Sequence, residues 1–85
     1  MTTIYVGNLD PEVNERDLRG IFEGFGTVSS VKIIMDKYSG KSKGYGFVTM
    51  PSEWEAAKAI YEVNGANLNN KTIVVNEAKS KRINN

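Results

Sequence analysis

Two short segments of the chain combine aromatic rings with glycine, lysine and asparagine. Residues 4–9 read Ile-Tyr-Val-Gly-Asn-Leu, and residues 43–50 read Lys-Gly-Tyr-Gly-Phe-Val-Thr-Met. Aromatic rings offer large apolar contact surfaces, lysine attracts anions such as phosphate, and an asparagine amide both donates and accepts hydrogen bonds. These groups suit the recognition of a ligand, and the two segments contain no histidine, cysteine or carboxylate.

The chain as a whole lacks the side chains on which most catalytic and metal sites depend. It has no Cys and no His, which removes disulfides, thiol nucleophiles, a histidine base and the usual zinc ligands. Its carboxylates fall mainly on the solvated faces of expected helices, where no nucleophile, base and pocket come together. We therefore expect no catalytic residue, no cofactor and no metal.

Length and composition indicate a single small globular domain. The 85 residues allow one core, and 40% hydrophobic with 25% charged residues is ordinary for a soluble protein. No apolar run suits a membrane span, and the first residues do not resemble a secretory signal. We expect a monomeric domain over residues 1–79 and a basic polar tail over residues 80–85.

Hydrophobic periodicity predicts the strands that must position the aromatic residues. Apolar and polar residues alternate near residues 4–7, 30–35, 45–50 and 72–77, as in half-buried strands. In the second strand, Val31, Ile33 and Met35 are expected to face the core, and Met50 is expected to do so in the third. Residues 36–42 are expected to form a loop.

Two further segments, with apolar residues at spacings of three and four, predict helices. The first helix follows Asn14 as its N-cap and is expected to end before Gly26. The second begins with a capping box of Ser52 and Glu55 and ends at residues 64–65. The core stripes comprise Leu18, Ile21, Phe22 and Phe25 in the first helix, and Ala56, Ala59, Ile60 and Val63 in the second.

This order of elements predicts an α+β fold of the ferredoxin-like β-α-β-β-α-β type, with a four-stranded antiparallel sheet. Two helices cover only one face of such a sheet, so the other face is open. Strand alternation places Tyr5, Tyr45 and Phe47 on the open face. Sheet propensity explains aromatic residues on strands, but it does not explain three of them together on the solvent side.

Charge is distributed unevenly, although the net charge is only +1. Residues 10–24 and 52–64, which contain the expected helices, hold eight acidic and three basic residues. The rest of the chain holds eight basic and two acidic residues. A fold with helices on one side and strands on the other would therefore carry a positive side that attracts phosphate.

The two aromatic segments resemble the paired motifs of the RNA recognition motif family. Residues 43–50 follow the RNP1 pattern K/R-G-F/Y-G/A-F-V-x-F/Y at every specified position but the last, where Met50 stands. Residues 4–9 resemble the companion RNP2 hexamer, and the resemblance extends over residues 3–79. The chain looks most like the small single-domain RNA-binding proteins of bacteria and the chloroplast ribonucleoproteins.

The resemblance implies that the open sheet binds single-stranded RNA, with single-stranded DNA as an alternative ligand. Tyr5 and Phe47 match family positions whose rings stack on bases. Tyr45 matches a position that packs against sugars, and Lys43 matches a position that pairs with phosphate. Further contacts are expected from Lys32, Asn8, Asn76 and Lys79. The implied role is a cytoplasmic RNA chaperone or post-transcriptional regulator, with a chloroplast or nuclear location left open.

Trp54 and Tyr61 fall outside the family pattern. At about 100° per residue, they lie opposite the core stripe of the second helix. We expect both rings to fold over the helix edge onto neighbouring strand or loop carbon. The alternative is that they bind a protein partner, because Trp and Tyr concentrate at interfaces. That alternative would make the chain a protein-interaction domain that acts through its second helix.

Overall fold

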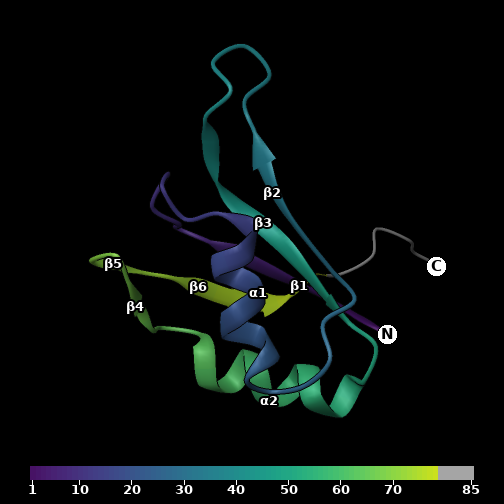
Figure 1. Cartoon of the computed structure of the whole chain (residues 1–85). Coiled ribbons are helices and arrows are strands. Elements are labelled where there is room, and N and C mark those ends of the chain that lie inside the picture. Colours follow the sequence, from purple (N-terminus) through teal and green to yellow (C-terminus); the bar gives the residue numbers. More distant parts are fainter. Residues whose placement is uncertain (79–85) are drawn as a thin grey trace, which may run out of the picture.

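A computed structural model describes residues 1–78 as a sheet with two helices on one of its faces (Figure 1). The elements are β1 (Thr2–Gly7), α1 (Glu15–Glu23), β2 (Ser30–Met35), β3 (Ser42–Met50), α2 (Glu53–Val63), β4 (Asn67–Leu68), β5 (Lys71–Thr72) and β6 (Val74–Glu77). The main sheet has the strand order β2-β3-β1-β6, and each pairing is antiparallel. The predicted ferredoxin-like fold with one open face is confirmed.

The core fills the space between the main sheet and the two helices. Alternate strand residues are buried in it, among them Ile4, Val6, Ile33, Val48 and Val75. The helices add Leu18, Phe22, Ala56, Ala59 and Val63. Met50, which departs from the RNP1 pattern, is fully buried, as expected for a core-facing residue. Because side chains alternate along a strand, the intervening residues of β1 and β3 face away from the helices.

Asn14 and Asp17 form a reciprocal capping box at the start of α1. Asn14 Oδ1 accepts the backbone N–H of Asp17 at 2.8 Å, and Asp17 Oδ2 accepts that of Asn14 at 3.0 Å. Two N–H groups that an isolated helix would leave without partners are thereby satisfied. The carboxylate also lies at the positive end of the helix dipole, so the predicted start of this helix is confirmed.

The end of α1 differs from the prediction. The helix stops at Glu23 with Gly24 as its C-cap, before the expected end next to Gly26. Phe25 donates its N–H to the carbonyl of Phe22 at 3.0 Å, which closes the last turn more tightly than an α-helix. Phe25 still packs against the core, so its apolar spacing extended the expected helix beyond its true end.

At the start of α2, only half of the predicted capping box forms. Ser52 Oγ accepts the N–H of Glu55 at 3.2 Å, whereas Glu55 Oε1 accepts the N–H of Thr27 at 3.2 Å. Glu55 thus connects α2 to the segment before β2, and it occupies the space that a Cβ on Gly26 would need. Within residues 1–78, neither helix is long and apolar enough to cross a membrane.

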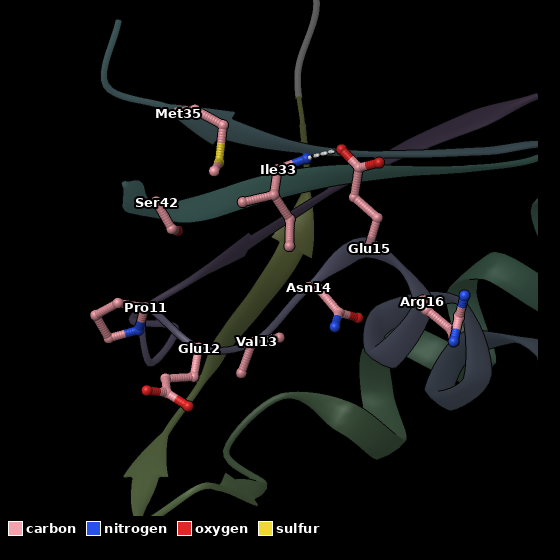
Figure 2. Close-up of a pocket in the computed structure, with 9 residues that line it drawn as sticks. All are labelled: Pro11, Glu12, Val13, Asn14, Glu15, Arg16, Ile33, Met35 and Ser42. Atoms are coloured by element: carbon pink, nitrogen blue, oxygen red, sulfur yellow. Dashed lines mark hydrogen bonds between the residues drawn. The ribbon is translucent and has the colours of Figure 1, made fainter. Parts of the chain in front are cut away.

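Strand β2 shifts its register against β3 between Ile33 and Met35. Ile33 is buried, but Met35 is 52% exposed, so Met35 is not part of the core as expected. Ile33 pairs with Gly46 and Met35 pairs with Ser42, which leaves extra residues on β3. The Met35 side chain lines the same hollow as Ile33 (Figure 2), but it lies at the end of β2, where it stays largely exposed. Glu15 of α1 accepts the N–H of Ile33 at 2.9 Å and so covers part of this edge strand (Figure 2).

A short hairpin of β4 and β5 precedes the last strand and was not predicted. Asn67 pairs with Thr72 and Leu68 pairs with Lys71. The two turn residues between them, Asn69 and Asn70, have φ values of 53° and 66°, as in the primed turns that suit two-residue hairpins. The predicted strand over residues 72–77 is consequently divided, and only β6 joins the main sheet.

Candidate nucleic-acid interface

One residue from each strand of the main sheet forms a row across the open face. The strand registers pair Lys32 with Phe47, Phe47 with Tyr5, and Tyr5 with Asn76. Neighbouring strands lie about 4.8 Å apart, so the row spans roughly 14 Å. Four predicted site residues, from segments far apart in the sequence, are therefore neighbours in the order Lys32, Phe47, Tyr5, Asn76.

Tyr45 joins Tyr5 and Phe47 to form a compact aromatic triangle. The ring centroids lie 5.9 Å apart for Tyr5 and Tyr45, 6.0 Å for Tyr5 and Phe47, and 6.1 Å for Tyr45 and Phe47. The Tyr45 and Phe47 rings are perpendicular, at 90°, an edge-to-face arrangement that aromatic pairs favour. All three rings are half-buried, so each keeps part of its surface available to a ligand.

Gly7 lies next to this aromatic triangle and opposite both Tyr45 and Val74. A Cβ on Gly7 would collide with the phenol ring and hydroxyl of Tyr5, so the Tyr5 ring lies across the space that glycine leaves. Val74 is 44% exposed and extends the apolar surface beyond Gly7. Val74 is not among the site residues predicted from the sequence.

Lys43 is exposed in the irregular part of β3, near a folded β2–β3 loop. Asp36 accepts the N–H groups of Ser39 at 3.0 Å and Tyr38 at 2.7 Å. These hydrogen bonds lower the pKa of Asp36, and the positive charge of Lys43 lowers it further. The loop is therefore ordered around an ionised Asp36 carboxylate, with Lys43 close enough to interact with it.

Asn8 uses its side-chain amide within the protein. Its Nδ2 donates to the carbonyl of Thr72 at 2.7 Å, which connects the β1–α1 loop to β5. The φ of Asn8 is 59°, a left-handed conformation that Asn adopts more readily than most residues. Asn8 thus has a structural role beside its predicted contact with bases. Lys79, the last predicted site residue, lies outside the described residues.

A hollow of about 390 Å³ adjoins the aromatic triangle at the end of the sheet where β1 finishes and β3 begins. Its lining includes Tyr5, Tyr45, Asn8, Lys43 and Lys71. Lys71 is not among the site residues predicted from the sequence. The Asn69-Asn70 turn was the available signal, because the hairpin it closes is what brings Lys71 to this end of the sheet.

A larger hollow of about 620 Å³ lies between the start of α1 and the ends of β2 and β3 (Figure 2). Its lining includes Val13 and Ile33, which face the core side of the sheet, and Met35. The carboxylates of Glu12 and Glu15 also line it. With two carboxylates against the one guanidinium of Arg16, this surface suits phosphate less well than the hollow that Lys43 and Lys71 line. It shares no lining residue with the aromatic triangle.

Trp54 and Tyr61 are 85% and 84% exposed on α2. The expectation that they fold over the helix edge is therefore wrong. Both rings lie on the side of α2 opposite its buried residues Ala56, Ala59 and Val63, which pack against the sheet. No described element extends far enough around α2 to cover them, so they form an exposed aromatic surface on the side of the domain away from the aromatic triangle.

Comparison with known proteins agrees with this geometry. The family profile described as RNA recognition motif matches residues 4–74. The cytotoxic granule-associated RNA binding protein tiar-1 of Caenorhabditis elegans is 46% identical over 78 residues, which are 92% of this chain and 19% of that protein. The chloroplastic 28 kDa ribonucleoprotein of Nicotiana sylvestris is 41% identical over 78 residues, 92% of this chain and 28% of that protein.

Solved structures share the fold over nearly the whole chain. RNA binding protein PG1 superposes with a TM-score of 0.91 at 37% identity, covering 98% of this chain and 100% of that one. The Sxl-lethal protein in complex with RNA gives a TM-score of 0.90 at 31% identity, covering 95% of this chain and 48% of that one. This chain spans less than half the length of the two curated relatives. Its sequence motifs, its sheet and the matched profile agree, and the chain belongs to the RNA recognition motif family.

Proposed function

We propose that the open sheet of this chain binds single-stranded RNA, holding about two to four nucleotides without chemistry of its own. The aromatic triangle carries the proposal, because three rings with centroids about 6 Å apart lie on the sheet face that the helices leave uncovered. Relatives named as RNA-binding proteins and a similar structure in complex with RNA support it.

In this proposal, Tyr5 and Phe47 stack successive bases and Tyr45 packs against the sugars. Each stacked base contributes about 1–3 kcal/mol by alanine substitution. Stacking needs only a flat π surface, so it demands little of the sequence and admits single-stranded DNA as a weaker ligand. Asn76 and Lys32, at the two ends of the row, can reach base edges or phosphates next to the stacks.

Charge favours the same face. Lys32 and Lys43 are exposed on or beside the open sheet. The first turns of both helices carry acidic residues instead: Glu15 and Asp17 in α1, Glu53 and Glu55 in α2. A polyanion is therefore attracted to the sheet and repelled from the helices. Affinity for RNA should fall with salt, by a slope of about 0.7 in log–log form for each phosphate contacted.

The test is a titration of labelled mixed-sequence single-stranded RNA with the wild type, Tyr5→Ala and Phe47→Ala, read by fluorescence anisotropy. Each variant should lose about 5- to 160-fold in affinity, the equivalent of about 1–3 kcal/mol. Tyr61→Ala is the matched control, because it removes an exposed tyrosine from α2 instead. Equal affinity of all four proteins, each shown to be folded, would refute the proposal.

A second candidate function is a protein contact through α2. The exposure of Trp54 and Tyr61 favours it, since large aromatic rings are seldom left so free without a use. If the α2 surface binds a protein, Trp54→Ala should abolish a partner recovered with the wild type and leave RNA affinity unchanged. A monomeric sedimentation profile together with identical partners for both proteins would remove this candidate.

The resemblance to bacterial single-domain proteins favours a cytoplasmic location, and relatives named as chloroplastic represent the competing case. Fractionation of the source cells distinguishes the two. Recovery of the protein with organelles would replace the cytoplasmic proposal by an organellar one, and recovery in the cytosolic fraction would support it.

A further inference from the structure

We infer that Lys71, which lines the hollow at the end of the sheet together with Lys43, adds a second phosphate contact and holds a backbone phosphate outside the stacked pair of bases. The hollow has a volume of about 390 Å³, and it is lined by both lysines and by Tyr5 and Tyr45 of the aromatic triangle. This inference rests on the proposed RNA-binding function and adds a residue, Lys71, that the sequence motifs do not include.

The two lysines come from separate elements that are fixed to the same loop. Leu9 of the β1–α1 loop donates its N–H to the carbonyl of Gly44 at 2.8 Å, which attaches the loop to β3. Asn8, in the same loop, donates to the carbonyl of Thr72 at 2.7 Å and attaches it to β5. Lys43 directly precedes Gly44, and Lys71 directly precedes Thr72. Both backbones are therefore positioned by neighbouring hydrogen bonds.

The charges around the hollow suit an anion. No carboxylate is among its lining residues, in contrast to the larger hollow beside α1, which Glu12 and Glu15 line. Within residues 1–78, neither Lys43 nor Lys71 takes part in an ion pair. Asp36, whose pKa Lys43 lowers, already accepts two backbone N–H groups of its own loop. Two lysines outside any salt bridge of the described residues thus border one hollow.

The position of the hollow identifies the anion as a nucleic-acid phosphate. Tyr5 and Tyr45 line the hollow and also belong to the aromatic triangle, so a strand stacked on the triangle continues directly into it. Gly44, which also lines the hollow, has no side chain to obstruct the chain of the ligand. Lysine ammonium groups bind phosphate as compact point charges with rotatable donors. Such a contact does not depend on which bases the nucleic acid carries.

The test compares the wild type with Lys71→Gln on mixed-sequence RNA of two and of six nucleotides, with dissociation constants measured by NMR titration at several salt concentrations. For the hexanucleotide, Lys71→Gln should weaken binding about fivefold at 0.1 M salt and reduce the log–log salt slope by about 0.7. For the dinucleotide, whose single phosphate lies between the stacked bases, the two proteins should bind alike. Lys71→Arg should keep the wild-type slope.

Lys58→Gln is the matched control, because it removes an exposed lysine from α2, away from the hollow. A hexanucleotide in which a neutral methylphosphonate replaces the phosphate next to the stacked pair should bind wild type and Lys71→Gln equally. The Lys71 contact is refuted if Lys71→Gln matches Lys58→Gln in affinity and slope while Tyr5→Ala still weakens binding. If Tyr5→Ala also has no effect, the RNA-binding function itself fails, and the Lys71 contact fails with it.

Discussion

The ring of Tyr5 lies over Gly7, two residues further along β1 and on the same face of the sheet. A Cβ on Gly7 would meet the Tyr5 ring carbons and hydroxyl. Gly7 also pairs with Tyr45 of β3, so the residue without a side chain stands next to two rings of the aromatic triangle. The orientation of Tyr5 depends on this missing side chain.

Gly7→Ala should therefore weaken RNA binding while the fold persists. The new methyl group displaces the Tyr5 ring, which is the end of a flexible side chain and can move without disturbing the backbone. Gly7→Ala should bind RNA more weakly than the wild type, but its loss of affinity should be smaller than the roughly 5- to 160-fold loss expected for Tyr5→Ala. Anisotropy measures the affinity, and circular dichroism confirms the fold. Wild-type affinity for Gly7→Ala would show that the ring orientation is unimportant.

Gly20→Ala serves as the contrasting glycine variant. Gly20 lies inside α1, and nothing lies within 4 Å of the position its Cβ would take. Alanine favours a helix interior over glycine by about 0.8–1.0 kcal/mol, so chemical denaturation should show a stabilisation of that order. RNA affinity should not change, because α1 is on the other side of the sheet. A destabilised Gly20→Ala would contradict the packing described for α1.

Replacement of Asn8 should separate its two structural contributions. Asn8→Gly keeps the left-handed backbone conformation but removes the hydrogen bond to Thr72, and should cost about 1 kcal/mol of folding free energy. Asn8→Ala should cost a further 1–2 kcal/mol, approximately, because alanine disfavours positive φ. Urea denaturation of the three proteins measures both differences. Equal stability of the alanine and glycine variants would argue against the left-handed conformation.

The β2–β3 loop should lose its order in acid. The pKa of Asp36 lies below the ordinary aspartate value of 3.8, chiefly because the carboxylate accepts hydrogen bonds from the N–H groups of Ser39 and Tyr38. A carboxyl whose folded pKa is depressed contributes stability above its unfolded pKa, and that contribution is lost as the pH falls through the folded pKa. The Tyr38 and Ser39 amide signals should therefore titrate with a midpoint below 3.8 in NMR spectra.

Asp36→Asn is the control for this titration, because the amide accepts hydrogen bonds without ionising. Its Tyr38 and Ser39 signals should not move over the same acid range. A midpoint at or above 3.8 in the wild type would contradict the hydrogen bonds assigned to Asp36.

The aromatic site could be predicted because strand alternation has a fixed period. Once residues 4–7 and 45–50 are recognised as strands, Tyr5, Tyr45 and Phe47 must share a face, and the structure confirms this. The register that aligns Lys32, Phe47, Tyr5 and Asn76 in one row could not be deduced in the same way. It depends on how far each strand slides along its neighbour, which no single strand specifies.

Three of the differences from prediction share a cause, because each depends on a contact between segments distant in the sequence. Glu55 leaves its own capping box to bind Thr27 of another segment. Met35 faces the same side as Ile33 but is 52% exposed, since cover at the end of β2 would have to come from another segment. Trp54 was expected to pack against carbon atoms of a neighbouring strand or loop, but its ring is exposed. Whether such a neighbour is within reach depends on how the elements around α2 are packed. Local periodicity contains no information on contacts between segments that are distant in the sequence.

The most direct test of the central claim is to map the RNA-binding surface by NMR, titrating isotope-labelled protein with a mixed-sequence hexanucleotide. The backbone amide signals of Tyr5, Tyr45 and Phe47 should shift most, those of Lys43 and Lys71 should shift with them, and those of Trp54 and Tyr61 on α2 should stay in place. Shifts concentrated on α2, with an unaffected aromatic triangle, would contradict the assignment of the open sheet as the RNA-binding surface.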